Sequence, residues 1–118
     1  MKLLIVDDHD VTRGLIRNLV GTLASEVREC ASGEEAVRQC EQFQPDVVTM
    51  DLQMKRLNGL EATRLILARI PSACVVVLTH SNLAPLREAA LRAGAAHFLL
   101  KDNLDELRRF LQHRTAHE

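Results

Sequence analysis

Apolar residues are concentrated in five short runs along the chain, with longer amphipathic stretches between them. The runs cover residues 2–6, 26–30, 46–50, 73–78 and 95–100. The first, third and fourth runs are almost continuous in Val, Ile, Leu or Met, which is typical of parallel strands covered on both faces. The second run alternates between apolar and polar residues, and this pattern predicts a strand at the edge of the sheet.

The stretch after the first run has helical spacing. Asp10 stands where a helix N-cap is expected, and apolar residues follow it at helical intervals. The predicted inward face consists of Val11, Leu15, Ile16, Leu19, Val20 and Leu23. We therefore expect all six residues to pack on the sheet.

Helix start and stop signals mark the other four amphipathic stretches. Three of them begin with capping-box pairs, which are Ser32 with Glu35, Asn58 with Glu61, and Asn103 with Glu106. The remaining helix has Pro85 in its first turn and Gly94 just after its end, where each residue is favoured. These signals predict a helix after every strand.

A strand followed by a helix, five times over, predicts an α/β protein with right-handed crossovers and a doubly wound, five-stranded parallel sheet. By analogy with other sheets of this kind, we expect the flavodoxin-like (βα)5 arrangement with strand order 2-1-3-4-5. The length of 118 residues fits one hydrophobic core, so residues 1–118 are predicted to form a single domain with no effector domain.

Composition and charge narrow the classes of function. The chain has 15 basic and 16 acidic residues, so we expect neither direct nucleic acid binding nor attachment to a membrane surface. Cys30, Cys40 and Cys74 lack the spacing of a zinc or redox motif and are interpreted as reduced core thiols. The apolar runs are too short for a signal peptide or a membrane span, which favours a cytoplasmic location.

Polar residues stand at the carboxyl ends of four of the five runs. They are Asp7 and Asp8, Asp51, Thr79, and Lys101. Ligands of doubly wound folds bind outside the carboxyl ends of the strands, so these side chains are expected to converge. Two carboxylates about 4 Å apart repel each other by roughly 4 kcal/mol at an effective dielectric constant near 20. A divalent cation would relieve this repulsion, and oxygen donors suit Mg²⁺ better than zinc.

The same constellation suits phosphoryl transfer. Positioning and charge neutralisation carry most of that reaction, and a carboxylate can act as the nucleophile and form an acyl phosphate. Asp51 is the candidate nucleophile because it stands opposite the pair Asp7 and Asp8. A purely structural role for Lys101, neutralising the acidic cluster, remains an alternative.

Five positions in register on the predicted fold carry a resemblance to a known family. Across the whole chain, the set Asp7, Asp8, Asp51, Thr79 and Lys101 resembles the receiver domain of bacterial two-component response regulators. The segment "VTMDLQM" is similar to the phosphorylated strand of the family, and "LNGLEA" to the start of its third helix. The segment "FLLKD" is similar to the subgroup of LuxR/NarL-type transcriptional regulators.

The resemblance implies a role for each site residue. Asp51 would accept a phosphoryl group from a phosphohistidine of a sensor histidine kinase or a phosphotransfer protein. Asp8, Asp51 and the backbone carbonyl of Gln53 would bind Mg²⁺, and Asp7 would hold a metal-bound water. Lys101 would pair with a phosphoryl oxygen.

The resemblance also implies a conformational switch. Thr79 would move to bind another phosphoryl oxygen, and Phe98 would turn inward behind it. A plain core aromatic is an equally good interpretation of Phe98. The output surface would consist of the fourth helix, the fifth strand and the fifth helix, and it would regulate a partner or a DNA-binding effector, linked or separate. A homodimer on this surface, or on the first and fifth helices, is left open.

Three other functions compete with this interpretation. A flavodoxin-like cofactor module is disfavoured because the loop after the first strand is acidic and would repel a phosphate. A haloacid-dehalogenase-like phosphatase usually has a second Asp two residues after its nucleophile, where this chain has Gln53. A receiver-like interaction module would act without phosphorylation. In none of the favoured readings is the chain an enzyme acting on an external substrate, since a receiver catalyses only its own phosphorylation and dephosphorylation.

The chain departs from the family pattern near the site. Lys55 and Arg56 stand in a loop where the family usually has a proline, and they are either solvated loop residues or contacts for the phosphodonor. His80 replaces the small residue that often follows the threonine, and is expected to narrow access to Asp51. His9 is not expected to bind Mg²⁺, because imidazole competes poorly with carboxylates for a hard ion.

Overall fold

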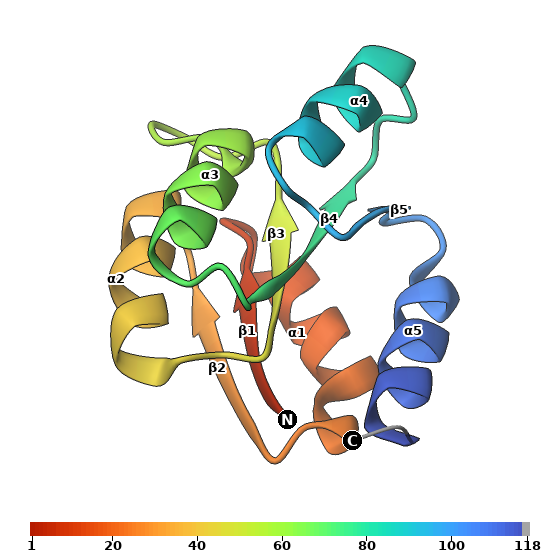
Figure 1. Cartoon of the computed structure of the whole chain (residues 1–118). Coiled ribbons are helices and arrows are strands. Elements are labelled where there is room, and N and C mark those ends of the chain that lie inside the picture. Colours follow the sequence, from red (N-terminus) through yellow and green to blue (C-terminus); the bar gives the residue numbers. More distant parts are fainter. Residues whose placement is uncertain (117–118) are drawn as a thin grey trace.

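The structure is a computed structural model that describes residues 1–116, and it is built around five parallel strands in the order β2-β1-β3-β4-β5 (Figure 1). The strands are β1 (Lys2–Val6), β2 (Glu26–Cys30), β3 (Val47–Asp51), β4 (Cys74–Thr79) and β5 (His97–Leu100). The helices are α1 (Asp10–Val20), α2 (Gly33–Phe43), α3 (Gly59–Arg69), α4 (Ala84–Arg92) and α5 (Leu104–Ala116), and a short 3₁₀ turn, η1 (Gly21–Leu23), follows α1. The predicted doubly wound, flavodoxin-like fold is confirmed.

Two hydrophobic layers sandwich the sheet. Alternate residues of β1 face opposite sides, with Leu4 and Val6 toward α2, α3 and α4, and Leu3 and Ile5 toward α1 and α5. The strands β1 and β3 and most of β4 are buried on both faces, whereas β2 alternates between exposed and more buried residues. The continuous and alternating apolar patterns in the sequence reflect this difference between central and edge strands.

Strand bounds differ from the sequence-based expectation where the site begins. The third and fourth runs were expected to end at residues 50 and 78, but each strand continues for one more residue. Asp51 pairs with Leu78, and Thr79 pairs with Leu100, in the parallel ladder. The backbones of Asp51 and Thr79 are therefore fixed by the sheet, which is more rigid than a connecting loop.

The side-chain caps predicted for α2 and α3 form, whereas those predicted at Asp10 and Asn103 differ in the structure. Asn103 Nδ2 donates to Glu106 Oε1 at 3.1 Å, and the Glu106 N–H donates to the Asn103 backbone carbonyl and not to its side chain. Ser32 Oγ accepts the Glu35 N–H at 3.2 Å, and Asn58 Oδ1 accepts the Glu61 N–H at 2.9 Å. The prediction that Asp10 caps α1 is wrong. His9, with an extended backbone, is the N-cap residue and makes no side-chain cap bond. 

The N-terminus of α1 is set by the acidic loop that precedes it. The Asp7 carboxylate accepts the His9 N–H, and the His9 carbonyl accepts the Arg13 N–H at 3.0 Å. His9 is thereby the residue at which the chain turns into the helix. Asp10 falls in the first turn, and its carboxylate pairs with Arg13.

The predicted inward face of α1 is also partly wrong. Val11 is 77% exposed and Leu15 is 56% exposed, whereas Ile16 and Val20 are buried. At 100° per residue, Val11 and Leu15 lie about 100° or more from the direction midway between Ile16 and Val20. The apolar positions of α1 therefore form two stripes, of which only one packs on the sheet.

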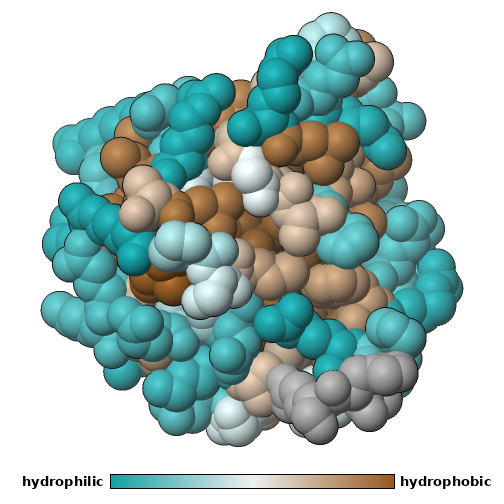
Figure 2. All heavy atoms as spheres, viewed as in Figure 1, coloured by the Kyte–Doolittle hydropathy of each residue, from teal (hydrophilic) through white to brown (hydrophobic). Residues whose placement is uncertain are grey.

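The surface is mainly hydrophilic, with apolar residues gathered between α3 and α4 on the face shown in Figure 2. Large exposed apolar side chains on these two elements and their borders include Leu65, Leu83 and Leu91. No helix of the described residues 1–116 is long and apolar enough to cross a membrane.

Glycines 59 and 14 give a matched test of this packing. A Cβ atom at Gly59 would clash with the Asp51 carbonyl oxygen and lie 2.8 Å from Leu52 Cα, both of which are backbone atoms. A Cβ atom at Gly14 would have no neighbour within 4 Å. We expect Gly59→Ala to lower the free energy of unfolding by about 1–3 kcal/mol. We expect Gly14→Ala, in the interior of α1, to raise it by about 0.5–1 kcal/mol.

Urea unfolding followed by circular dichroism measures both changes. Equal effects of the two substitutions would contradict the close approach of α3 to the end of β3.

Candidate functional site

A buried lysine bridges two buried carboxylates at the carboxyl edge of the sheet. Lys101 Nζ lies 2.7 Å from Asp7 Oδ2 and 3.1 Å from Asp51 Oδ1. Asp7 is 1% exposed, Asp51 is 3% exposed, and the Lys101 side chain is 5% exposed. The ends of β1, β3 and β5 thus meet, as the sequence predicted, although Asp7 and Lys101 are 94 residues apart along the chain.

Local turns orient the polar side chains of this site. The Asp7 carboxylate accepts the His9 N–H at 2.9 Å, and the Asp51 carboxylate accepts the Gln53 N–H at 3.2 Å. Thr79 Oγ1 accepts the Ser81 N–H at 3.2 Å. In each case the acceptor binds a backbone donor two residues later, a turn geometry that fixes the side chain without help from distant residues.

Two carboxylate oxygens of the cluster are buried and lack a hydrogen-bond partner among the described residues. They are Asp51 Oδ2 and Asp8 Oδ1. An unsatisfied buried oxygen is costly, and a charged one more so, unless an ion or a ligand group binds it. One ligand atom each from Asp7, Asp8, His9 and Asp51 can be chosen so that all four lie within 4.8 Å of one another. The donor set therefore fits a divalent cation.

Burial and neighbouring charges shift the pKa values of Asp51 and Lys101. Burial raises the pKa of Asp51, and the nearby Asp7 carboxylate raises it further, against the opposing effect of Lys101. Burial lowers the pKa of Lys101, but the hydrogen bonds to Asp7 and Asp51 outweigh it, and its pKa lies above the usual value. Lys101 is therefore cationic, and one ammonium group does not fully offset the carboxylates around it.

Arg13 is a residue of the site that the sequence reasoning missed. Its Nη1 donates to the Asp7 carbonyl at 2.7 Å, its Nε donates to Glu29 at 3.2 Å, and its Nη2 donates to Asp10. Burial lowers the pKa of Arg13, but the bonds to Asp10 and Glu29 more than compensate, so its pKa is raised. The guanidinium group ties β1, α1 and β2 together behind the acidic loop.

The sequence contained one signal for this role. Arg13 follows Asp10 at a spacing of three, which places the two side chains on one face of a helix. The contact with Glu29 of β2 comes from tertiary structure and could not be inferred from spacing.

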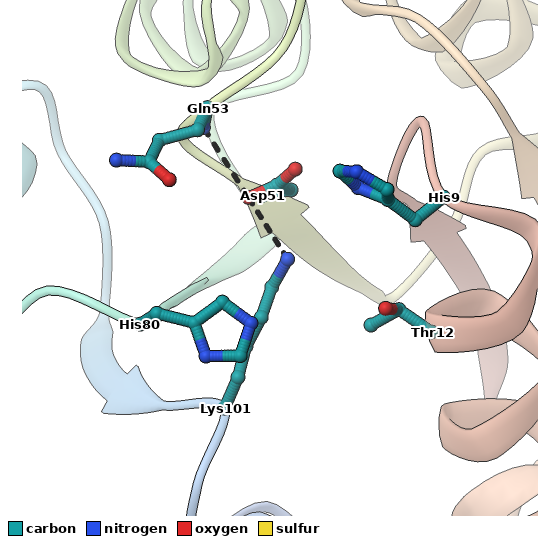
Figure 3. A pocket seen from close by; sticks show the side chains of 6 residues that line it. All are labelled: His9, Thr12, Asp51, Gln53, His80 and Lys101. Carbon is teal, nitrogen blue, oxygen red and sulfur yellow. Dashed lines mark hydrogen bonds and ion pairs between the residues drawn. The ribbon is translucent and has the colours of Figure 1, made fainter.

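A pocket of about 190 Å³ opens over Asp51 (Figure 3). Its lining residues are His9, Thr12, Asp51, Gln53, His80 and Lys101. In Figure 3, His9 and His80 lie on opposite sides of Asp51 and Lys101. Thr12 was not anticipated, and it faces the pocket from the first turn of α1. His80 lines the pocket as its position suggested, and its Nδ1 lies 3.3 Å from Asp102 Oδ1.

Four further predicted residues are not among those that line this pocket. Thr79 is buried at the end of β4, and Phe98 is buried in β5 with the Arg87 guanidinium 5.3 Å from the centre of its ring. Lys55 and Arg56 are exposed in the loop between β3 and α3, and Arg56 has a positive φ of 62°. Neither of these two cations lines the pocket.

Comparisons with known proteins agree with this architecture. The model of the response regulator receiver domain family matches residues 3–112. The response regulator GacA of Pseudomonas syringae pv. syringae is 38% identical over 103 residues, which are 86% of this chain and 48% of GacA. The chemotaxis protein CheY of Listeria monocytogenes is 38% identical over 102 residues, which are 86% of each protein. The chain thus spans about half the length of GacA.

A solved structure adds the three-dimensional match. The two-component response regulator of the LuxR family from Aurantimonas sp. SI85-9A1 has a TM-score of 0.88 and 28% identity, over 99% of this chain and 86% of that one. The resemblance to receivers, including the LuxR group, is confirmed. Because the family model matches nearly the whole length of this chain, the chain belongs to the response regulator receiver domain family and is a regulatory domain of two-component signalling.

Proposed function

We propose that Asp51 is the phosphoacceptor of this receiver and that its donor is a phosphohistidine on a sensor histidine kinase or a phosphotransfer protein. One observation carries the proposal. Asp51 lines the pocket, and its buried Oδ2 atom has no hydrogen-bond partner among residues 1–116, while its Oδ1 atom is held by Lys101 and Gln53. One oxygen is anchored, and the other is available to attack phosphorus.

The reaction is an exchange of one bond for another. Asp51 Oδ2 forms a bond to phosphorus, the bond from phosphorus to the imidazole nitrogen breaks, and the imidazole leaves with its electron pair and takes up a proton. Lys101 would pair with a phosphoryl oxygen as negative charge accumulates. Asp8, Asp51 and the Gln53 carbonyl would hold Mg²⁺, with Asp7 on a metal-bound water. Bound Mg²⁺ supplies charge neutralisation and a template for in-line displacement.

The switch would begin at Thr79. Its hydroxyl oxygen now accepts the Ser81 N–H, and binding a phosphoryl oxygen requires it to reorient and donate its proton. Such a change displaces the loop that leads into α4. Phe98 lies inward, under Arg87 of α4, so the output surface of α4, β5 and α5 begins directly above it. Phosphate charge acting on this loop is a standard way to bias two arrangements.

The relatives support a partner beyond the kinase. GacA is about twice as long as the segment it shares with this chain, and LnrK of Bacillus subtilis, which is 37% identical over 105 residues, is a transcriptional regulatory protein. We infer that residues 1–118 form one receiver unit that regulates a DNA-binding effector, linked or separate. A homodimer would form through the same output surface or through α1 and α5.

Phosphorylation at Asp51 can be tested with a small-molecule donor. We expect incubation with Mg²⁺ and acetyl phosphate to give one phosphoryl adduct by intact mass, because no partner is needed to present this donor to the pocket. Asp51→Ala is expected to abolish the adduct, and Asp8→Ala to reduce it. Asp105→Asn, at an exposed carboxylate at the start of α5, is the control. An adduct that survives Asp51→Ala would disprove the assignment, and an unmodified wild type would favour an interaction module.

The raised pKa of Asp51 predicts that its negative charge lowers the stability of the fold in a pH-dependent way. Because its folded pKa lies above its unfolded pKa, Asp51 contributes stability below the unfolded value, and this contribution is lost as pH rises through the folded pKa. In chelator at pH 7, we expect Asp51→Asn to raise Tm by about 4 °C, which is roughly 1 kcal/mol for a domain of this size. The gain should shrink toward pH 4.

Thermal unfolding with and without Mg²⁺ measures this effect. Mg²⁺ should stabilise the wild type more than Asp51→Asn, since the cation binds the folded state. A less stable Asp51→Asn in chelator at pH 7 would refute the excess of negative charge in the pocket.

The contacts of Arg13 predict that it positions the acidic loop. Arg13→Met keeps most of the side-chain volume but removes the bonds to the Asp7 carbonyl, Asp10 and Glu29. We expect the Mg²⁺ dissociation constant to rise about tenfold, as is common when a support of metal ligands is removed. Arg17→Met is the matched control, because Arg17 binds the same Glu29 at 2.8 Å on the exposed side. Calorimetric titration of both variants with Mg²⁺ measures this change. Equal losses of Mg²⁺ affinity in the two variants would assign Arg13 a general structural role only.

A further inference from the structure

His9 stands at the rim of the acidic cluster and has unusual contacts with it. Its Nδ1 atom lies 2.9 Å from Asp8 Oδ1 and 3.4 Å from Asp7 Oδ1. Asp8 Oδ1 nevertheless has no hydrogen bond within the part of the chain that the structure describes. The short contact is therefore not directed as a hydrogen bond, in contrast to that between His80 and Asp102.

The spacing of these atoms can be compared with that of donor atoms around one metal ion. In an octahedral site with bonds of about 2.1 Å, adjacent ligand atoms are about 3.0 Å apart and opposite ones about 4.2 Å. The contacts of His9 Nδ1 at 2.9 and 3.4 Å are close to the adjacent spacing. The four ligand atoms of Asp7, Asp8, His9 and Asp51 lie within 4.8 Å of one another, so a contraction of a few tenths of an ångström would bring them to one ion.

A second observation points to a ligand independently of His9. Asp51 is only 3% exposed, and its buried Oδ2 atom has no hydrogen-bond partner in residues 1–116. Lys101 occupies the other oxygen of Asp51 and one oxygen of Asp7. In Figure 3 the His9 ring lies beside Asp51, on the side away from Gln53 and His80.

The nature of the donor atoms determines which ion this arrangement favours. Carboxylate oxygens suit Mg²⁺, but imidazole suits borderline cations, whose affinity for nitrogen donors rises from Mn²⁺ through Co²⁺ to Ni²⁺ and Cu²⁺. His9 therefore adds little for Mg²⁺. It adds a matched donor for a borderline ion.

We propose that His9 Nδ1, together with Asp7, Asp8 and Asp51, makes this pocket a binding site for a borderline divalent cation such as Co²⁺ or Ni²⁺. The inference rests on the proposed function, because the same carboxylates serve Mg²⁺. Both cations occupy one place, so they compete. A neutral His9 ring would bind the ion through the Nδ1 lone pair and keep its proton on Nε2.

Calorimetric titration of the full chain, freed of metal by a chelator, tests the inference with Co²⁺ and with Mg²⁺ as probes. We expect wild type to bind Co²⁺ more tightly than Mg²⁺, and His9→Phe to lower this preference at least tenfold. His9→Gln, which keeps a polar side chain without an imidazole nitrogen, should lower it as well. His80→Phe is the matched control, since His80 lines the same pocket but its Nδ1 is bonded to Asp102.

A spectroscopic measurement identifies the ligand directly. An imidazole bound to Co²⁺ gives a strongly shifted N–H proton signal in the NMR spectrum in water. We expect this signal in wild type and in His80→Phe and its loss in His9→Phe and His9→Gln. Persistence of the signal in both His9 variants, or a Co²⁺ preference that changes less than threefold in both, would overturn the inference.

The two proposals fail in different ways. A wild type that takes up neither Mg²⁺ nor a phosphoryl group would refute the proposed function. A wild type that binds Mg²⁺ and is phosphorylated at Asp51, but whose Co²⁺ preference does not depend on His9, would refute only the role of His9. The melting temperature of each variant in chelator shows that it is folded, and two variants at position 9 guard against failure of one.

Discussion

Negative charge at the carboxyl edge of the sheet exceeds the positive charge that the protein supplies there. Lys101 bridges Asp7 and Asp51, while one oxygen of Asp51 and one of Asp8 have no hydrogen-bond partner in the described structure. Burying an ion pair is costly unless its remaining lone pairs are also satisfied. A third buried or half-buried carboxylate makes the deficit larger. The pocket is therefore organised to gain a cation or a phosphoryl group, and its unsatisfied charge is the source of its chemistry.

The fold holds these charges together through its backbone. Asp51 and Thr79 each pair with a residue of the neighbouring strand in the parallel ladder. The Asp7 N–H donates to the Cys30 carbonyl, and the Lys101 N–H donates to the Thr79 carbonyl. Burial of the strands on both faces stabilises these positions by the hydrophobic effect, which is far larger than the repulsion among a few carboxylates. The core thus sustains a local arrangement that would not form by itself.

Much of the fold and of the site could be predicted from the sequence, because the spacing of apolar residues and the residues that end each element were clear. Continuous apolar runs marked the central strands, and the polar residue at the end of each run marked one edge of the sheet. Convergence of Asp7, Asp51 and Lys101 then followed from parallel topology alone. The errors arose where tertiary contacts decide. Spacing did not distinguish the buried stripe of Ile16 from the exposed stripe of Val11 in α1, since both are apolar.

Side-chain direction was the second limit of the sequence reasoning, and it also governs how the site is coupled to the surface. Arg13 reaches Glu29 on β2, and Phe98 lies under Arg87 of α4, and neither contact is encoded in local spacing. The Lys101 N–H donates to the Thr79 carbonyl, so the two residues proposed to bind the phosphoryl group share a backbone bond. Phe98 lies in β5, three residues before Lys101, which directly follows the strand. A displacement at Thr79 would therefore act on β5 and on the ring beneath α4 through adjacent residues, with no need for a long path of side-chain contacts.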